Sequence, residues 1–211
     1  MQLPTERYVE QVSRWPAEGR HILAHHDAET IIVYQAYRRS IGEHAIKHGV
    51  FGNGFSYARM SWIKPNFLWM MYRSGWGTKE GQETTLGSRL RREFFDRILA
   101  QAVASSLDQS DHTSREAWRA AVETSQVRLQ WDPDHDPHGN AVARRAIQLG
   151  LRGAVLEDFG KRELLEVIDM TAFVAEQREL ISGAGVGELR TPAERVYSPG
   201  EEAIARRLQL D

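Results

Sequence analysis

The 211-residue sequence contains no cysteine, which excludes disulfide bonds, thiol nucleophiles and Cys-ligated zinc sites. It also contains no apolar run near the roughly 18 residues that a membrane-spanning helix needs. The first residues, MQLPTERYVEQ, are charged and lack the apolar segment of a secretory signal peptide. These absences predict a cytoplasmic protein that does not enter a membrane.

Several catalytic signatures are missing as well. The sequence has no G-x-G-x-x-G, no phosphate-loop lysine motif, no G-x-S-x-G and no H-E-x-x-H. Ordinary kinases, Rossmann dehydrogenases, α/β-hydrolases and zinc proteases are therefore disfavoured. The net charge is only −2, so the molecule as a whole does not attract nucleic acid, and any anion site has to be a local patch.

The length fits one domain with a substantial core, and the order of predicted elements favours an α+β fold with a small split sheet flanked by helices. Residues 1–29 are polar and expected to be irregular apart from a short helix at residues 6–15, and residues 30–211 form the predicted single domain. We predict strands at 30–37, 56–64, 127–131 and 144–151, and a short strand within 189–199. The predicted helices are one that ends at Gly49 and others over 66–74, 85–105, 114–125, 153–174 and 200–210.

One stretch, RMSWIKPNFLWMMYRSGWGTK at residues 59–79, is rich in aromatic and basic residues and has no acidic residue. Cations bind phosphate oxygens, and aromatic rings offer a face to a planar base or nicotinamide. We therefore expect phosphate contacts from Arg59, Lys64, Arg73 and Lys79. The rings expected to line the planar slot are those of Trp62, Trp69 and Tyr72. The alternative is that the aromatic side chains are core and the cations ordinary surface charge.

Just after residue 74, the glycine-rich loop Gly75–Gln82 could close over a ligand bound at this stretch.

A second candidate lies in the predicted strand TIIVYQAY, where alternation places Gln35 and Tyr37 on one face. A glutamine inside a buried strand has to form hydrogen bonds, because burial without them is costly. Gln35 therefore either satisfies neighbouring backbone groups or holds the ribose or amide of a ligand.

A third candidate is LQWDPDHDPHGN at residues 129–140, where Gln130 and Asp132 share one face of an extended strand. A carboxylate beside an amide can orient a hydroxyl group and stabilise a developing cation. The aspartates and histidines of this segment could instead bind a metal ion, but a calcium loop would need glycine at its sixth position and glutamate at its twelfth. The residues Asp, Pro, Gly and Asn also favour a tight turn, and we assign no metal here.

The runs TIIVYQAY, the basic aromatic stretch, VRLQWDPDHDPHGN and RRAIQLGLRG resemble the family catalogued as domain of unknown function 4291, over residues 30–174. The layout is also similar to that of ADP-ribosyltransferases. This similarity implies that Gln35 and Tyr37 position the nicotinamide ribose of NAD and that Ser61 lies on the second strand. It places Gln130 and Asp132 at the reacting centre, where the family usually has glutamate and this chain has the shorter aspartate.

The resulting prediction is an ADP-ribosyltransferase-like enzyme that binds NAD and modifies a protein, nucleic acid or small-molecule acceptor. One alternative is an RNA-end or nucleotide-processing enzyme, similar to 2′-phosphotransferases, that uses the same cations on phosphate. Another is a non-catalytic nucleic-acid or protein binding module. Glu194, in the last predicted strand, is an alternative to Asp132 as the catalytic acid.

Overall fold

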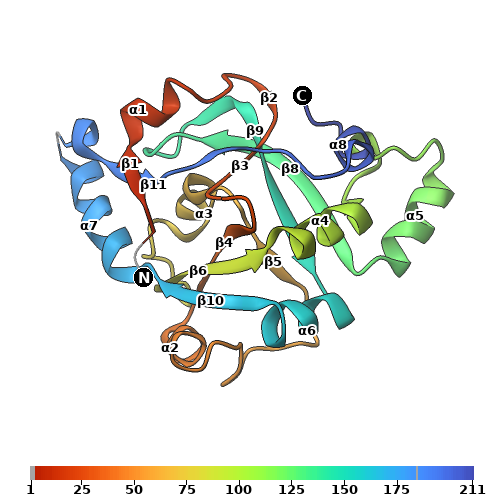
Figure 1. Cartoon of the computed structure of the whole chain (residues 1–211), viewed down its shortest axis with the longest axis horizontal. Helices are drawn as coiled ribbons and strands as arrows, with labels where there is room; N and C mark the ends of the chain where they lie inside the picture. Colours follow the sequence, from red (N-terminus) through yellow and green to blue (C-terminus); the bar gives the residue numbers. More distant parts are fainter. Residues whose placement is uncertain (1–2, 184) are drawn as a thin grey trace.

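The computed structural model describes residues 3–183 and 185–211 as one α+β domain (Figure 1). A three-stranded antiparallel sheet has the order β10-β6-β4. Its strands are β4 (Thr30–Tyr37), β6 (Thr84–Arg91) and β10 (Leu164–Asp169). Both neighbours of β6 pair with it along most of their length, so β6 is the central strand of this sheet.

A larger mixed sheet has the order β2-β9-β8-β7, and β5 also pairs with β9. Its strands are β2 (Gly19–Arg20), β5 (Ser61–Ile63), β7 (Val103–Ala104), β8 (Val127–His135) and β9 (Ala141–Leu151). The long antiparallel hairpin of β8 and β9 is the main part of this sheet, with Gln130 opposite Gln148. Its turn is shorter than predicted, because β8 continues to His135 instead of ending at Trp131.

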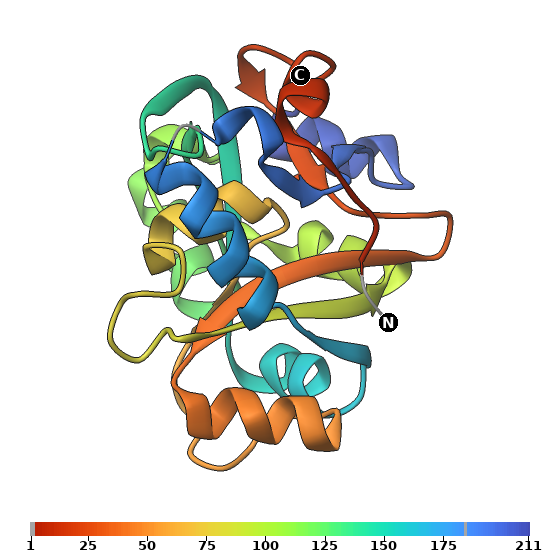
Figure 2. The same ribbon diagram turned by 90° about the vertical axis from the view of Figure 1, so that its left-hand side faces the viewer.

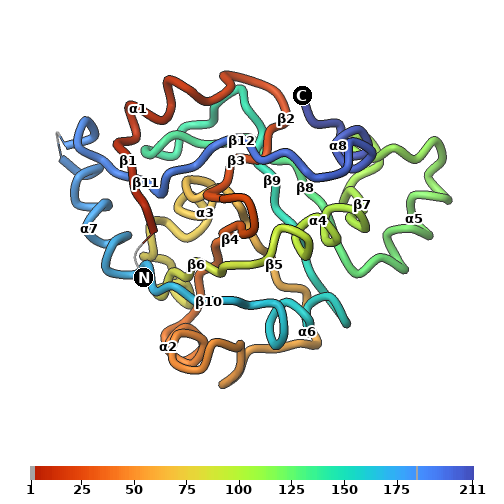
Figure 3. Tube along the Cα trace, in the orientation of Figure 1, coloured from red at the N-terminus to blue at the C-terminus, as the bar shows by residue number. Residues whose placement is uncertain are grey.

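Two strand pairs join the beginning of the described chain to its end (Figure 3). They are β1 (Thr5–Arg7) with β11 (Arg190–Pro192), and β3 (Ile22–Ala24) with β12 (Arg195–Tyr197). The described part of residues 1–29 contains β1, α1, β2 and β3 joined by irregular segments, and α1 lies within the short helix predicted at residues 6–15. The boundary between residues 29 and 30 stays a prediction.

In Figure 1 helix α3 lies near the centre of the view, α7 at the left and α5 at the right. The α-helices of the described residues are α1 (Tyr8–Val12), α2 (Arg39–His48), α3 (Phe67–Ser74), α4 (Arg92–Gln101), α5 (Arg115–Thr124), α6 (Gly153–Lys161), α7 (Thr171–Ser182) and α8 (Glu202–Leu208). Two 3-10 turns, η1 (Leu107–Gln109) and η2 (Val186–Glu188), complete them. The predicted end of α2 is confirmed, because Gly49 has a left-handed φ of 71° and closes the helix.

Three predicted elements differ from the structure. Residues 85–105 form β6 followed by α4 instead of one helix, and residues 153–174 contain α6, β10 and the start of α7. The predicted strand at 56–64 shrinks to the three residues of β5. The error over β6 has a physical reason: Leu86 and Leu90 are four apart, and that spacing fits one face of a strand as well as one face of a helix.

The core has two parts, and β4 separates them. Ile31 and Val33 point into the larger cluster, which includes residues of β8, β9, α4 and α6. Ile32 and Tyr34 point the other way, into a smaller cluster with α3 and α7. Since β4 is buried on both faces, any polar side chain on it has to find partners inside the protein.

Candidate functional site

The two sheets meet at Lys64, the residue that follows β5. Its backbone N–H donates to the carbonyl of Tyr34 at 3.2 Å, and its carbonyl accepts from the Tyr34 N–H at 2.7 Å. Residues 61–63 pair at the same time with β9, where Ile63 lies opposite Leu149. The backbone of Lys64 therefore fixes the edge of β4 against the β8–β9 hairpin, and the candidate site is built around this junction.

On the β4 side of the junction, three predicted residues form one hydrogen-bonded group. The Gln35 amide nitrogen donates to the Tyr37 hydroxyl at 2.6 Å and to the Ser61 hydroxyl at 3.0 Å. The two hydroxyl oxygens are 2.6 Å apart and share a further hydrogen bond. Burial raises the pKa of Tyr37 far above its usual value, so this phenol stays protonated at neutral pH.

A cavity of about 230 Å³ opens beside this group. Six of the predicted binding residues line it, namely Gln35, Tyr37, Ser61, Trp62, Lys64 and Arg73. They share the wall with Ala36, Met60, Met70 and Gln82. Gln82 belongs to the glycine-rich loop that follows α3, which projects from the body of the molecule in Figure 2. The cavity therefore combines hydroxyl and amide groups with two cations and is bordered by a loop.

Lys64 is the unusual charge in this cavity, because the residue is only 6% exposed. Within the described residues its ammonium group forms no hydrogen bond and no ion pair, and the Nζ atom is not among the fully buried polar atoms, so it reaches the cavity surface. Burial and the nearby Arg73 guanidinium lower the pKa of Lys64, whereas the Asp132 carboxylate raises it, and the result is about 7. An anion bound in the cavity would supply the negatively charged partner that the Lys64 ammonium group lacks.

On the hairpin side of the junction, Asp132 is held by two glutamine amides. Gln130 donates to one carboxylate oxygen at 2.9 Å, and Gln148 donates to the other at 2.7 Å. Asp132 does not line the cavity, but its charge acts on Lys64. Sequence reasoning missed Gln148, although the signal was the same as for Gln35: a glutamine within a strongly apolar predicted strand.

Four predicted binding residues do not line the cavity. The rings of Trp69 and Tyr72 stack on His135, with centroids 5.3 and 3.6 Å from it, and this stack lies outside the cavity. The Lys79 ammonium donates to the backbone carbonyl of Arg73 at 2.6 Å, and Arg59 is exposed outside the cavity. Of the predicted phosphate contacts, the structure brings only Lys64 and Arg73 together.

Glu194, the alternative acid, lies on the opposite side of β4 from Gln35. One of its carboxylate oxygens accepts the backbone N–H of Phe67 at 2.8 Å, at the first turn of α3. Glu194 is fully buried beside Tyr34, and desolvation raises the pKa of both groups well above their usual values. Glu194 therefore lies beside the second core cluster and is separated from the cavity by a strand.

The remaining acidic residues of the 129–140 segment form hydrogen bonds within the protein. Asp134 is buried and accepts two hydrogen bonds from the Arg144 guanidinium, at 2.6 and 2.9 Å. Asp136 accepts the backbone N–H groups of His138 and Asn140 at 2.9 Å and thereby forms the hairpin turn. No group of three or more potential metal-ligating residues gathers anywhere in the described part of the chain.

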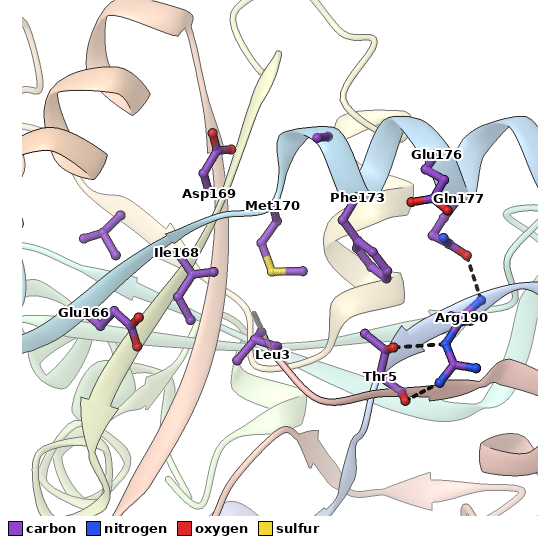
Figure 4. Close-up of a pocket in the computed structure, with 12 residues that line it drawn as sticks. Leu3, Thr5, Glu166, Ile168, Asp169, Met170, Phe173, Glu176, Gln177 and Arg190 are labelled. Atoms are coloured by element: carbon purple, nitrogen blue, oxygen red, sulfur yellow. Dashed lines mark hydrogen bonds between the residues drawn. The ribbon is translucent and has the colours of Figure 1, made fainter. Parts of the chain in front are cut away.

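A larger cavity, of about 710 Å³, lies between β10, α7 and the first residues of the described chain (Figure 4). Its floor is apolar, with Leu3, Met170 and Phe173, and Asp169 and Glu176 add acidic groups. Its one lining guanidinium, Arg190, is already bonded to the Thr5 hydroxyl and carbonyl at 3.0 and 2.7 Å. This cavity is therefore a poorer environment for a phosphate than the smaller one at Lys64.

The fold and the site define a single α+β domain with a cation-lined cavity where two sheets meet. The chain belongs to the family described as Domain of unknown function (DUF4291), whose model matches residues 21–197. A search of curated proteins gave no match. In the described residues no helix has both the length and the apolar character to cross a bilayer.

Proposed function

We propose that this protein is an ADP-ribosyltransferase-like enzyme that binds NAD at the Lys64 cavity. The observation that carries the proposal is the convergence of Gln35, Tyr37 and Ser61, from two different strands, beside two cations without a carboxylate partner. NAD needs both kinds of group, because it joins ribose hydroxyls to a pyrophosphate. The volume is below the range of about 300–1,000 Å³ that suits a drug-sized ligand, so the cavity takes one end of NAD.

In this proposal Lys64 and Arg73 bind the pyrophosphate by charge-assisted hydrogen bonds. The hydroxyls of Tyr37 and Ser61, held by Gln35, position the nicotinamide ribose. Cleavage of the glycosidic bond leaves positive charge on that ribose, and a fixed carboxylate stabilises such a charge. Asp132 supplies this carboxylate charge through space. Its two glutamine partners hold the carboxylate in place without neutralising its charge.

The release of nicotinamide from NAD tests this proposal. Asp132→Asn keeps the shape of the side chain and removes its charge, so we expect turnover to fall by about 10²-fold or more with little change in NAD affinity. Glu43→Gln, an equivalent change on the exposed face of α2, is the control and leaves turnover unchanged. Equal turnover in the Asp132→Asn variant and the wild type would remove Asp132 from the mechanism.

A second candidate, an RNA-end or nucleotide-processing enzyme similar to 2′-phosphotransferases, is favoured by one observation. The charged residues that line the cavity are Lys64 and Arg73, and a phosphate group alone could bind to both. Such an enzyme binds a short 2′-phosphorylated RNA with an affinity that falls steeply with salt, about one unit of logarithmic slope for each phosphate contacted. Salt-sensitive RNA binding without NAD binding favours this candidate over the first.

A further inference from the structure

The amine of Lys64 has the surroundings of a nucleophile as well as those of an anion contact. Its side chain is almost fully buried, it has no hydrogen-bond acceptor among the described residues, and it borders the cavity together with Arg73. Desolvation and a neighbouring cation both favour the neutral form of an amine, which carries the lone pair that attacks a carbonyl carbon.

No ion pair accounts for the burial of Lys64. The other three lysines of the chain, Lys47, Lys79 and Lys161, are exposed. Lys79 donates to a backbone carbonyl and Lys161 lies 3.6 Å from Glu157. Lys64 is the buried lysine. The Arg73 guanidinium lowers its pKa, and the Asp132 carboxylate raises it.

We propose that Lys64 is a reactive amine that forms an imine with a phosphorylated aldehyde, of the class of open-chain sugar phosphates. The inference goes beyond the proposed function, because the adduct needs a phosphorylated carbonyl compound and no NAD. Arg73 binds the phosphate, which brings the carbonyl group to Lys64 Nζ. The hydroxyl groups of Tyr37 and Ser61 face the sugar hydroxyls.

The step is balanced without a further reactant. The Nζ lone pair forms a bond to the carbonyl carbon while the carbon–oxygen π bond breaks, which gives a carbinolamine. The oxygen then leaves as water with the two protons that the amine has lost, and a carbon–nitrogen double bond remains. An added borohydride reductant converts this imine into a stable secondary amine, so the adduct can be mapped by mass spectrometry.

The test uses the intact protein, incubated with ribose 5-phosphate, ADP-ribose or unphosphorylated ribose in the presence of cyanoborohydride. Peptide mapping then gives the fraction of each lysine that is modified. We expect Lys64 to be modified at least about tenfold more than Lys47, Lys79 or Lys161 by one of the two phosphorylated sugars at pH 7.5, and pyrophosphate to block it. The sugar that reacts faster identifies the source of the aldehyde.

The dependence of Lys64 modification on pH is a second test, and it needs no variant. Lys64 should reach a plateau above a midpoint near pH 7, whereas an ordinary lysine amine has a pKa of about 10.4. Modification of Lys64 by neither phosphorylated sugar, or modification of all four lysines to the same extent, would overturn the proposal. Equal labelling by ribose and ribose 5-phosphate would overturn the role given to the phosphate.

Discussion

At the scale of single residues, two buried ionisable groups of the described chain, Lys64 and Glu194, form no ion pair, and they lie on opposite sides of β4. Burial lowers the pKa of the Lys64 amine to about 7 and raises the pKa of the Glu194 carboxyl group well above its usual value. Each is an expensive group to bury, so each makes a measurable contribution to stability. Their contributions depend on pH in opposite directions.

Replacement of Lys64 by Met should stabilise the protein and abolish ligand binding. The pKa of Lys64 is lower in the folded state than the roughly 10.4 of an unfolded chain, so folding releases a proton between about pH 7 and pH 10. This group therefore destabilises the fold most at pH 6 and least at high pH. We expect Lys64→Met to raise the free energy of unfolding by at least about 1 kcal/mol at pH 6, measured by urea denaturation. A large loss of stability would mean that the ammonium group has a partner in the fold.

Replacement of Glu194 by Gln should change the pH dependence of stability. The raised pKa of Glu194 means that the folded state holds a proton that the unfolded state loses above about pH 4.3. This contribution to stability is complete at low pH and falls as the pH rises. Gln keeps an acceptor for the Phe67 N–H, so Glu194→Gln should equal the wild type near pH 4 and exceed it at pH 8 in urea denaturation. Glu43→Gln, on an exposed helix face, serves as the control.

At the scale of elements, α3 links the stability of the fold to the geometry of the cavity. It begins directly after Lys64 and Pro65, and Asn66 caps it by accepting the backbone N–H of Trp69 at 2.6 Å. Arg73 lies in its last turn, so the helix sets the separation of the two cavity cations. The capping residue therefore affects both stability and the geometry of the cavity.

Asn66→Ala should lower the free energy of unfolding by about 1 kcal/mol, the usual cost of losing an N-cap. Asn66→Ser keeps a neutral side-chain acceptor at this buried position and is the matched variant, so it should lose less stability than Asn66→Ala. Thermal unfolding followed by circular dichroism distinguishes them. The same loss of stability in both variants would show that the cap bond does not stabilise α3.

Elements could be predicted where local chemistry decides the structure. The strand over residues 30–37 and the helix with Asn66 and Gly75 at its ends carry clear signals, namely a β-branched run, a cap and a left-handed glycine. Residues 84–91 could not be assigned in this way, because leucines four apart satisfy both periods and only the pairing with β4 and β10 selects a strand. The junction at Lys64 rests on long-range pairing, which no local pattern reveals.

The candidate site was predictable by residue type more than by arrangement. Gln35, Tyr37 and Ser61 are joined by hydrogen bonds, and the ribose-binding role that the resemblance to ADP-ribosyltransferases implies for them stays a prediction. The aromatic stretch was harder to interpret, because α3 turns Trp69 and Tyr72 toward His135 instead of toward the cavity. In a helix with so many apolar residues, the sequence does not show which face is buried. The burial of Lys64 follows only from the meeting of the two sheets.

At the scale of the whole molecule, the segment before residue 30 contributes β3 to the core. Ile22, Leu23 and Ala24 are almost completely buried, and their strand pairs with β12 near the other end of the chain. A variant that begins at residue 30 loses this strand and the apolar burial that it provides. We expect it to lose cooperative thermal unfolding, whereas a cooperative transition near that of the full chain would support a separate domain from residue 30 onward.

The most direct test of the central claim is an isothermal titration of NAD into the wild-type protein and into Arg73→Ala. We predict saturable binding to the wild type that weakens by about tenfold or more in the variant, because one of the two cavity cations is gone. Arg39→Ala, which removes an exposed cation of α2, should bind as the wild type does. No heat of binding from NAD, or equal affinity in all three proteins, would contradict the assignment of the Lys64 cavity to NAD.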